Sequence, residues 1–500
     1  MRKYFIQTFG CAMNQADSEK INMIFLQSGF MKVNDWRKSD VVIFNTCSVR
    51  QKWEDRVFGL SEEIYKYNTE NTSNILIGIT GCMVRKTWIN KQYLEEDVSR
   101  DKNESKKINL LSNKEEIFNY DDKLFPRLWD KLDFTLRIEE TKYLPLMLTH
   151  ILGESIWNDS KFDDYLKSKQ LRENPAQANV IIQTWCDNYC TFCIVPYTRG
   201  WELSRKPEEI LWECREAVKN WAKEITLIWQ NVNSYWKQFV DKKLWNAEKS
   251  TWKTAKTLSW NTTSSPDQNA TITTFTSPFR ALLDNINSIE WLDRIRFTSS
   301  NPHDMTQDIL DSHIELTNNC NYLHFALQSW SDKMLKRMNR KHSYADFKKQ
   351  VDYLRSQDPL FSISTDIIVW YSWETEEMFQ ETVQAFKECD FDFCFTARYS
   401  VRKWTLADKM YPDDVSDEEK ARRWHILNDL LLKSIQKRNK LMLWREEEIL
   451  ISWEKDEQFF WRTRNFKEVF FPKNHHNKVW DIVKVKINAL DKFVLLWSEI

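Results

Sequence analysis

The first hundred residues repeat one pattern of hydrophobic and polar positions three times: a short apolar run, a cysteine, and then polar sequence with helical character. The apolar runs cover residues 4–8, 41–46 and 75–80, and they lead to Cys11, Cys47 and Cys82. Alternation at this interval predicts βαβ units that form a parallel sheet. Because the carboxyl ends of parallel strands share one edge, we expect the three cysteines to converge there. Three unrelated buried cysteines are the alternative.

A second series of apolar runs begins at residue 179. Strands are expected at residues 179–183, 225–228, 294–297, 323–327, 364–369 and 391–395. Amphipathic helical stretches, such as residues 207–222 and 344–356, separate them. This repetition predicts a full or partial βα barrel whose active site lies at the strand carboxyl ends. Residues 246–277, which are rich in Thr, Ser and Asn and lack periodicity, are expected to form a surface insertion.

The pattern changes again near residue 441, to short β segments at residues 448–452, 469–471 and 482–486, which predict a small β-barrel. The basic residues between positions 461 and 490 are Arg462, Arg464, Lys467, Lys473, Lys478, Lys484 and Lys486. With the phenylalanines nearby, they favour an RNA-binding face; an ordinary solvated charged surface is the alternative. The sequence therefore predicts an α/β protein with domains at residues 1–150, 176–435 and 441–500.

Composition narrows the class of protein. The chain has 500 residues and a formal net charge of −1, so any contact with a nucleic acid must come from local patches. The amino terminus runs directly into a strand-like segment without a signal-peptide core, and no apolar run approaches the ~20 residues that span a bilayer. Cysteines clustered as for metal binding fit a reducing compartment. We expect a soluble, cytoplasmic monomer without membrane association.

Cys186, Cys190 and Cys193 form a CxxxCxxC motif directly after the first strand of the second series. Three thiolates at this spacing can hold three irons of a 4Fe–4S cluster, which leaves the fourth iron without a protein ligand. Such an iron can bind and reduce a small molecule. A zinc site is the alternative, although zinc ligands usually come in paired motifs. The four cysteines without ligand spacing are expected to be buried as small hydrophobic residues: Cys214, Cys320, Cys389 and Cys394.

Six segments of the chain resemble motifs of one known family. They are Thr-Phe-Gly-Cys-Ala-Met-Asn (8–14), Asn-Thr-Cys-Ser-Val-Arg (45–50), Gly-Cys (81–82), the CxxxCxxC motif continued by Ile-Val-Pro-Tyr-Thr-Arg-Gly (194–200), Gln-Asn-Val-Asn-Ser-Tyr (230–235) and Phe-Thr-Ala-Arg-Tyr-Ser (395–400). With these segments the chain resembles the tRNA methylthiotransferases of the MiaB type, which are radical S-adenosylmethionine enzymes, over nearly its whole length. Its carboxyl-terminal segment is similar to a TRAM domain, a tRNA-binding barrel.

The resemblance implies a Rossmann-like amino-terminal domain, a partial TIM-type radical S-adenosylmethionine barrel and a TRAM-like barrel. It implies methylthiolation at C2 of N6-isopentenyladenosine next to the anticodon of tRNA. Two molecules of S-adenosylmethionine would serve as radical source and methyl donor. The CxxxCxxC motif would hold one 4Fe–4S cluster, whose open iron chelates S-adenosylmethionine, and the three earlier cysteines would hold a second cluster. Flavodoxin or ferredoxin would act as electron donor.

Three further polar residues are candidates for binding cofactor or substrate. Glu202 follows the cysteine motif and could hold the methionine ammonium of S-adenosylmethionine through a charge-assisted hydrogen bond. Gln230 and Asn231 lie just past a predicted strand end. Ordinary polar residues at strand ends would look the same. No side chain is assigned as acid or base, because breaking an aromatic C–H bond needs a cofactor radical.

Two alternatives stay open on sequence alone. One is a methylthiotransferase for threonylcarbamoyl-adenosine in tRNA or for an aspartate of a ribosomal protein. The other is a non-enzymatic Fe–S or zinc RNA-binding protein. The motif sequences around Cys11 and Cys47 and residues 230–235 favour isopentenyladenosine. Cleavage of S-adenosylmethionine after reduction would exclude the second alternative.

Glycine and tryptophan occur in unusual numbers. The chain has 7 glycines and 25 tryptophans, whereas average usage would give about 35 glycines. Several tryptophans stand where the resembling family has glycine: Trp185, Trp229, Trp236, Trp330, Trp370, Trp373 and Trp404. Our hypothesis is that the gene uses UGA as a sense codon for glycine, which the printed sequence renders as tryptophan. A genuinely tryptophan-rich enzyme is the alternative.

Overall fold

The computed structural model describes residues 1–48, 51–85, 87–89, 127–128, 131–154, 156, 170–172, 174–184, 186–199, 202–236, 276–455, 458–472, 477–491 and 494–498. These residues form two compact units. Unit 1 comprises Met1–Glu173, Trp185–Glu202 and Ser400–Pro412, and unit 2 comprises Asn174–Thr184, Leu203–Tyr399 and Asp413–Ile500. The expected surface insertion lies almost entirely outside the described residues.

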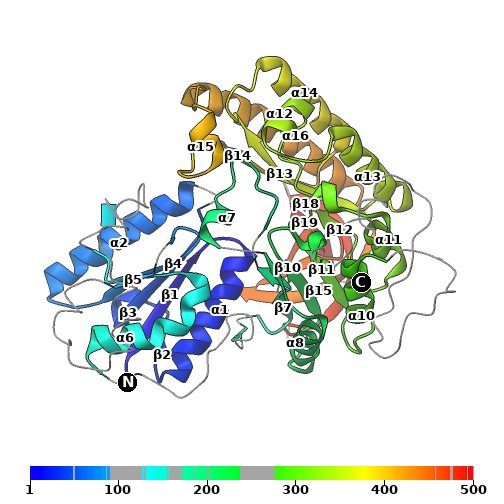
Figure 1. Ribbon diagram of the computed structural model, residues 1–500. Coiled ribbons are helices and arrows are strands. Elements are labelled where there is room, and N and C mark those ends of the chain that lie inside the picture. The colour runs from blue at the N-terminus through cyan, green and yellow to red at the C-terminus, as the bar shows by residue number, and fades with distance from the viewer. Residues whose placement is uncertain are drawn as a thin grey trace, which may run out of the picture. The chain divides into compact units, whose positions relative to one another are not determined.

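Unit 1 is built on a mostly parallel sheet with the strand order β2-β1-β3-β4-β6-β5. Its central strands β1 (Lys3–Phe9), β3 (Val41–Thr46) and β4 (Leu76–Gly81) pair in parallel. Helices α1 (Ala12–Gln27) and α2 (Gln51–Asn71) follow β1 and β3 and lie against opposite faces of the sheet (Figure 1). Every residue of β3 and β4 is buried, as expected for strands that are covered on both faces. The predicted βαβ pattern is confirmed.

The other elements of unit 1 are short. They are β2 (Met31–Lys32), β5 (Trp88–Ile89), β6 (Phe134–Leu136), α6 (Leu144–Leu152), α7 (Val195–Thr198) and α15 (Leu406–Met410). β5 pairs antiparallel to β6, whereas β6 continues the parallel pairing from β4.

The described part of unit 2 contains six parallel strands in two three-stranded sheets. The first sheet consists of β7 (Gln177–Ile181), β10 (Glu224–Ile228) and β11 (Arg294–Phe297), and the second of β12 (Tyr322–His324), β13 (Ser362–Val369) and β14 (Phe393–Arg398). A parallel bridge between Ser300 and Phe325 joins the segments that follow β11 and β12. The predicted series of parallel βα units is confirmed.

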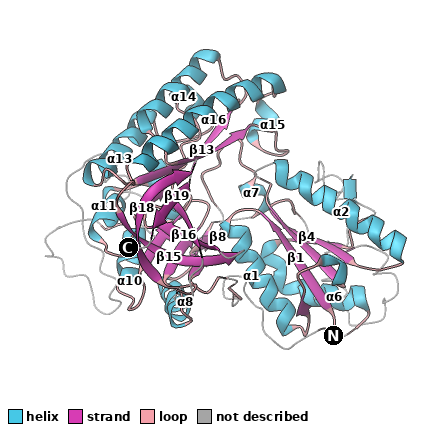
Figure 2. Ribbon diagram, turned by 180° about the vertical axis from the view of Figure 1, so that it is seen from behind, coloured by secondary structure: helices cyan, strands magenta, loops and turns pink. Residues whose placement is uncertain are grey.

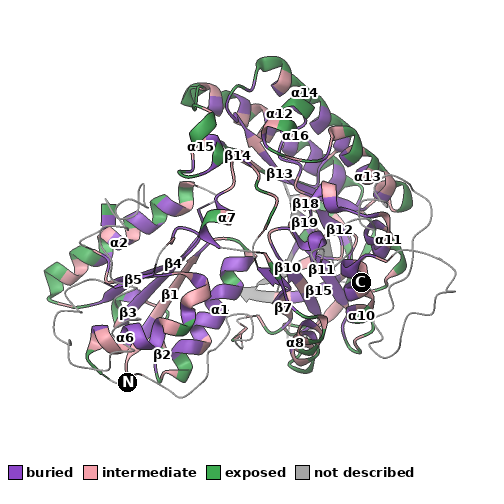
Figure 3. Cartoon of the chain, viewed as in Figure 1, coloured by how far each residue is buried: buried purple, intermediate pink, exposed green. Residues whose placement is uncertain are grey.

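The helices of unit 2 run along the outer side of these strands (Figure 2). They are α8 (Pro207–Lys219), α10 (Pro278–Asn287), α11 (Gln307–Glu315), α12 (Asp332–Arg337), α13 (Tyr344–Gln357), α14 (Glu376–Cys389) and α16 (Asp417–Lys440). Their inner faces are buried and their outer faces exposed (Figure 3). In α8, proline at the first turn starts the helix, and Ile210, Cys214 and Ala217 form the buried stripe at helical spacing. All four cysteines without ligand spacing are buried, as predicted: Cys214, Cys320, Cys389 and Cys394.

The end of unit 2 is a closed barrel with the strand order β15-β16-β17-β19-β18. Its strands are β15 (Glu446–Lys455), β16 (Gln458–Thr463), β17 (Glu468–Pro472), β18 (Ile482–Asp491) and β19 (Val494–Ser498). The barrel core contains Met442, Ile449, Ile451, Val469, Val485, Ile487 and Leu495. The predicted small β-barrel is therefore present.

Two of the basic residues expected to face RNA instead attach the barrel to the rest of unit 2. Lys467 is buried, and its Nζ lies 2.7 Å from Oδ1 of Asp392. Arg464 donates hydrogen bonds to three backbone carbonyls of the core. Between them, Phe466 stacks on Tyr322 with ring centroids 4.2 Å apart. Lys467 is thus a packing residue, so the prediction that it belongs to an RNA-binding face was wrong. Arg464 and Phe466 are half-buried, and the RNA-binding role of the barrel stays a prediction.

Two exposed lysines of the barrel have carboxylates as cross-strand neighbours. Lys484 and Lys486 of β18 stand opposite Glu448 and Glu446 of β15 in the strand register. Opposite charges across a strand pair attract each other and reduce the positive potential of that face. Lys478 is exposed outside this ladder, and Lys473 lies outside the described residues. Among the described residues, no helix combines the length and apolar character needed to cross a lipid bilayer.

Candidate functional site

Cys11, Cys47 and Cys82 follow the three central strands of unit 1. The amide of Cys47 donates to the carbonyl of Phe9 at 2.8 Å, and the amide of Cys82 donates to the carbonyl of Thr46 at 2.7 Å. Each of these two cysteines is thus tied to the end of the neighbouring strand, while Cys11 is the N-cap residue of α1. The predicted convergence at one sheet edge is confirmed.

The residues beside these cysteines fix this edge. The Nδ2 atom of Asn14 donates to Oδ1 of Asn45 at 3.0 Å and to the carbonyl of Thr46 at 3.1 Å. The Sγ atom of Cys11 lies 3.4 Å from Oδ1 of Asn14, so the same side chain holds the start of α1 against the end of β3. Gly81 has φ +91°, and a Cβ atom there would lie 2.3 Å from the carbonyl oxygen of Thr46. Only glycine fits this close approach.

Arg199 lies beside this cysteine set, although it belongs to the segment that follows the CxxxCxxC motif. Its Nη2 donates to Oδ2 of Asp17 at 2.8 Å, and its Nε donates to Sγ of Cys82 at 3.4 Å. Arg199 and Asp17 are 2% and 0% exposed, so this ion pair is fully buried. Although Cys11 as a residue is exposed, desolvation of its sulfur and the nearby Cys82 raise the pKa of this thiol, and Arg199 opposes that effect.

Sequence reasoning quoted Arg199 within a motif but gave it no role, and it missed Asp17 entirely. Asp17 stands in the middle of α1 among helical residues, where an acidic side chain usually faces solvent. Asp17 is buried because its carboxylate pairs with Arg199, at the end of α7.

Cys186, Cys190 and Cys193 lie in one loop of unit 1 and are all half-buried. The amide of Cys193 donates to the carbonyl of Cys190 at 2.9 Å, which closes a tight turn. Burial raises the pKa of the Cys186 thiol well above its usual value, and the neighbouring charges of Cys190, Cys193 and Glu202 act in the same direction. The three thiols and the Glu202 carboxylate are therefore close neighbours.

Glu202 accepts a hydrogen bond at Oε2 from the amide of Asp187, with a length of 3.1 Å. This bond holds the carboxylate against the cysteine loop. The structure thus places Glu202 beside the motif, as its sequence position predicted.

The two cysteine sets fit iron–sulfur clusters by the chemistry of their donors. Among the described residues, no group of three His, Cys, Asp or Glu side chains is arranged to hold a single metal ion. Cys82 nevertheless acts electrostatically on Cys11, and Cys190 and Cys193 act on Cys186. Three adjacent thiolates repel one another unless a cation lies between them, and thiolate is the usual protein ligand of Fe–S clusters.

Gln230 and Asn231 follow β10 in unit 2. Asn231 is buried, and its Nδ2 donates to Oδ2 of Asp304 at 2.8 Å. Its Oδ1 is buried and has no hydrogen-bond partner among the described residues. Gln230 is half-buried. Asn231 thus has a structural bond to Asp304, which sequence reasoning missed, and one acceptor atom that remains available at a strand carboxyl end.

Comparisons with known proteins match the whole chain. Residues 3–100 match a family described as Uncharacterized protein family UPF0004, and residues 180–386 match the Radical SAM superfamily. A protein from Clostridium botulinum named tRNA-2-methylthio-N(6)-dimethylallyladenosine synthase is 32% identical over 501 residues, which cover 100% of this chain and 97% of that protein. This chain belongs to the tRNA-2-methylthio-N(6)-dimethylallyladenosine synthase family. A relative of the same name from Protochlamydia amoebophila is 33% identical and covers 99% of this chain and 96% of its own length.

Membership in the synthase family confirms the resemblance that the motifs carried. The radical S-adenosylmethionine methylthiotransferases use S-adenosylmethionine and 4Fe–4S clusters as cofactors. Among solved structures, the radical S-adenosylmethionine methyltransferase TsrM from Kitasatospora setae aligns with a TM-score of 0.42 and 10% identity. The alignment covers 81% of this chain and 77% of that chain.

Proposed function

We propose that the protein methylthiolates C2 of N6-isopentenyladenosine next to the anticodon of tRNA. We further propose that it uses one S-adenosylmethionine as radical source and a second as methyl donor. The observation that carries this proposal is the full-length similarity to synthases of that name, in a chain that retains both cysteine sets.

The six motif cysteines are assigned as cluster ligands. Cys186, Cys190 and Cys193 hold the cluster that binds S-adenosylmethionine, and the set of Cys11, Cys47 and Cys82 holds the second. A 4Fe–4S cluster with one iron free of protein ligands supplies reductive cleavage of S-adenosylmethionine when bound. The proposal is supported by the position of Cys47 and Cys82 at neighbouring strand ends beside the start of α1, and by the tight turn that joins Cys190 and Cys193.

The protein's own side chains position the cofactors. Glu202 is held by the amide of Asp187 and can accept a hydrogen bond from the methionine ammonium. Arg199 places a positive charge beside Cys82, where it offsets part of the negative charge of a thiolate-bound cluster. Gln230 and Asn231 offer amide groups to a ligand of unit 2.

The domain roles and partners follow from this function. We assign residues 1–150 to the methylthiotransferase domain with the second cluster, 176–435 to the radical S-adenosylmethionine core and 441–500 to a TRAM-like tRNA-binding barrel. Flavodoxin or ferredoxin is the proposed electron donor, and the enzyme is proposed to act as a monomer in the cytoplasm.

The decisive test is anaerobic reconstitution followed by two measurements. After reduction, release of 5′-deoxyadenosine reports the radical reaction, and mass spectrometry of tRNA nucleosides reports 2-methylthio-N6-isopentenyladenosine. Matched tRNA carrying threonylcarbamoyl-adenosine is the control substrate. Product on the control tRNA alone would overturn the substrate assignment, and absence of 5′-deoxyadenosine from cluster-loaded protein would overturn the enzymatic function.

A further inference from the structure

The backbone of the protein adopts the left-handed conformation at an unusual set of residues. Fifteen non-glycine residues of the described part have positive φ, and eight of them are tryptophan: Trp221, Trp236, Trp291, Trp370, Trp373, Trp404, Trp444 and Trp480. The chain also has 29 phenylalanines and 16 tyrosines, yet each type contributes one residue to this set. A bulky side chain with positive φ is a genuine outlier.

Aromatic chemistry does not explain this bias. Tryptophan, tyrosine and phenylalanine all carry a planar ring on the same Cβ atom, so the left-handed region is unfavourable for all three. A preference that singles out tryptophan therefore has another origin. We propose that the native protein carries glycine at these eight positions, because UGA codons of its gene are translated as glycine in its own cell.

The end of α8 shows what such a position requires. Asn220 is its C-cap, and Trp221 follows with φ 74°. The amide of Trp221 donates to the carbonyl of Val218 and the amide of Ala222 to that of Ala217, each at 3.0 Å. This is the bond pattern of a Schellman motif, whose left-handed residue is usually glycine.

Helix α1 ends in the same motif with the expected residue. Gly29 has φ 80°, its amide donates to the carbonyl of Leu26 at 3.1 Å, and the amide of Phe30 donates to that of Phe25 at 3.0 Å. Nothing lies within 4 Å of a Cβ atom built on Gly29, so backbone conformation rather than space favours glycine there. Trp221 occupies the equivalent position and is 70% exposed.

Five more of the tryptophans occupy one position of a tight turn. In each case the residue after the tryptophan donates its amide to the carbonyl three residues earlier. The bonds are Leu292 to Ile289 (3.4 Å), Glu374 to Tyr371 (3.0 Å), Thr405 to Arg402 (3.3 Å), Arg445 to Met442 (3.2 Å) and Asp481 to Lys478 (3.1 Å). The tryptophan is the third residue of the turn, and positive φ at that position is the mark of a type II turn, which calls for glycine.

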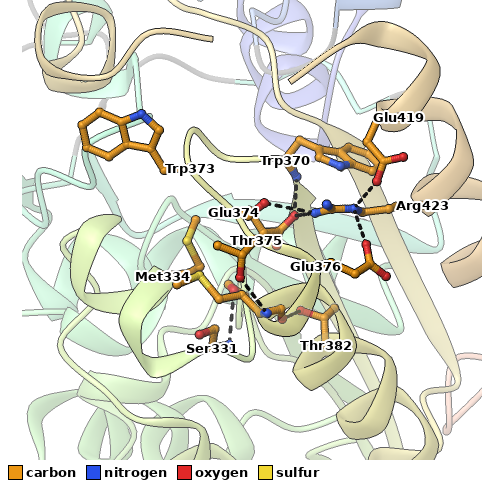
Figure 4. Close-up of polar contacts among 12 residues, drawn as sticks. Ser331, Met334, Trp370, Trp373, Glu374, Thr375, Glu376, Thr382, Glu419 and Arg423 are labelled. Atoms are coloured by element: carbon orange, nitrogen blue, oxygen red, sulfur yellow. Dashed lines mark hydrogen bonds and ion pairs between the residues drawn. The ribbon is translucent and has the colours of Figure 1, made fainter. Parts of the chain in front are cut away.

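In the loop after β13, the hydrogen bond of Trp370 to Glu374 comes from its backbone (Figure 4). The Trp370 indole is buried, stacks on Phe379 with ring centroids 6.5 Å apart and lies 5.6 Å from the Arg423 guanidinium. The amide of Trp370 donates to Oε2 of Glu374 at 2.9 Å, and Arg423 Nη1 lies 3.3 Å from the same oxygen. The indole Nε1 of Trp370 is buried without a hydrogen-bond partner among the described residues. The indole of Trp373 points away from this network (Figure 4) and is 44% exposed.

Positive φ at a tryptophan is a structural criterion for the glycine hypothesis that the sequence suggested. It supports Trp236, Trp370, Trp373 and Trp404, and it adds the four positions that sequence comparison did not single out: Trp221, Trp291, Trp444 and Trp480. At Trp229 and Trp330 the backbone does not have positive φ, so it gives no reason for glycine there. Trp185 lies outside the described residues.

A reassigned UGA codon accounts for two anomalies at once. UGA and the glycine codon GGA differ by one base, and a cell that reads UGA as glycine keeps UGG for tryptophan. Translation with tryptophan at UGA then lowers the glycine count and raises the tryptophan count together, as in a chain with 7 glycines and 25 tryptophans. Trp370 and Trp373 follow the carboxyl end of β13. Glycine at these positions would remove two indoles from the strand ends, where ligands bind in barrels of this type.

The direct test is peptide mass spectrometry of the protein isolated from its own cells. Glycine is expected at the eight positions. Tryptophan is expected at Trp424, an internal control with helical backbone whose Nε1 donates to the carbonyl of Thr396 at 3.2 Å. Tryptophan found at the eight positions would overturn the proposal.

A second test uses recombinant protein with the printed sequence and compares two exposed tryptophans of α8 and its end. Trp221→Gly is expected to raise the midpoint of thermal unfolding, because glycine adopts the left-handed backbone conformation of this position without steric strain. Trp212→Gly is the matched control, since Trp212 is 56% exposed inside the helix, where glycine is unfavourable. A fall in the midpoint for both variants would overturn the conformational argument.

Discussion

Arg199 joins the two cysteine sets of unit 1: its guanidinium pairs with Asp17 at 2.8 Å and donates to the sulfur of Cys82 at 3.4 Å. The residue stands six positions after Cys193 in the chain. A buried cation at this place ties the segment that follows the CxxxCxxC motif to α1, and it would offset negative charge of the proposed second cluster. Loss of either partner leaves an uncompensated buried charge, which costs about 3–5 kcal/mol.

We expect Arg199→Lys to keep the positive charge but to lose the simultaneous contacts of the guanidinium with Asp17 and Cys82. The variant should reconstitute with less iron, shift the spectroscopic signature of the second cluster and give less methylthio product, while 5′-deoxyadenosine formation persists. Iron content and electron paramagnetic resonance are the measurements. Arg215→Lys, at an exposed position of α8, is the control. If iron content and the resonance spectrum of Arg199→Lys match those of the unmodified protein, Arg199 has no role at the cluster.

Exposed lysines of the barrel should contribute affinity for tRNA. We expect Lys478→Glu to weaken tRNA binding and to flatten its salt dependence, because each lost phosphate contact lowers the slope by about one. Binding isotherms at several salt concentrations measure both effects. Lys219→Glu, an exposed charge on α8, is the control. Unchanged affinity and slope would contradict the TRAM-like role.

Deletion of residues 441–500 would be a poorer test of the same idea. Arg294 and Arg296 donate hydrogen bonds to backbone carbonyls of the barrel, and both are buried. Removing the barrel would take these carbonyl acceptors away from both guanidinium groups and leave Arg296 with its ion pair to Glu224, which would destabilise the parallel strands of the core.

Hydrophobic patterning predicted the strands well because burial on both faces forces a continuous apolar run, as in β3 and β4. Cysteine spacing predicted both thiol sets, since strand ends and one tight loop bring the ligands together. Patterning failed at Lys467 and Asp17, because a charged residue is expected at the surface until its buried partner is known. Those partners are 75 and 182 residues away in the chain, at Asp392 and Arg199.

Glu374 should make stability depend on pH. Burial raises its pKa from 4.5 to about 7, and the amide of Trp370 and Arg423 only partly oppose this effect. The folded protein therefore binds the proton more tightly than the unfolded chain does, so the contribution of Glu374 to stability is full below pH 4.5 and is lost as pH rises to about 7. A shift of this size corresponds to roughly 3 kcal/mol.

We expect Glu374→Gln to flatten the dependence of the unfolding free energy on pH over this interval. Chemical denaturation at several pH values gives the free energy. Glu381→Gln, at an exposed position of α14, should leave the dependence as it is. Equal slopes for Glu374→Gln and the unmodified protein would show that folding does not raise the pKa of Glu374.

The two cysteine sets should be separable, because the proposed function assigns them to successive half-reactions. We expect Cys190→Ala to abolish 5′-deoxyadenosine formation and all product. Cys47→Ala should leave reductive cleavage of S-adenosylmethionine measurable and give no methylthio product, since the sulfur-donating cluster is lost. Cys214→Ala, at a buried position on α8 without ligand spacing, is the control and should keep both activities. Methylthiolation by Cys47→Ala over several turnovers would refute the role of the second cluster.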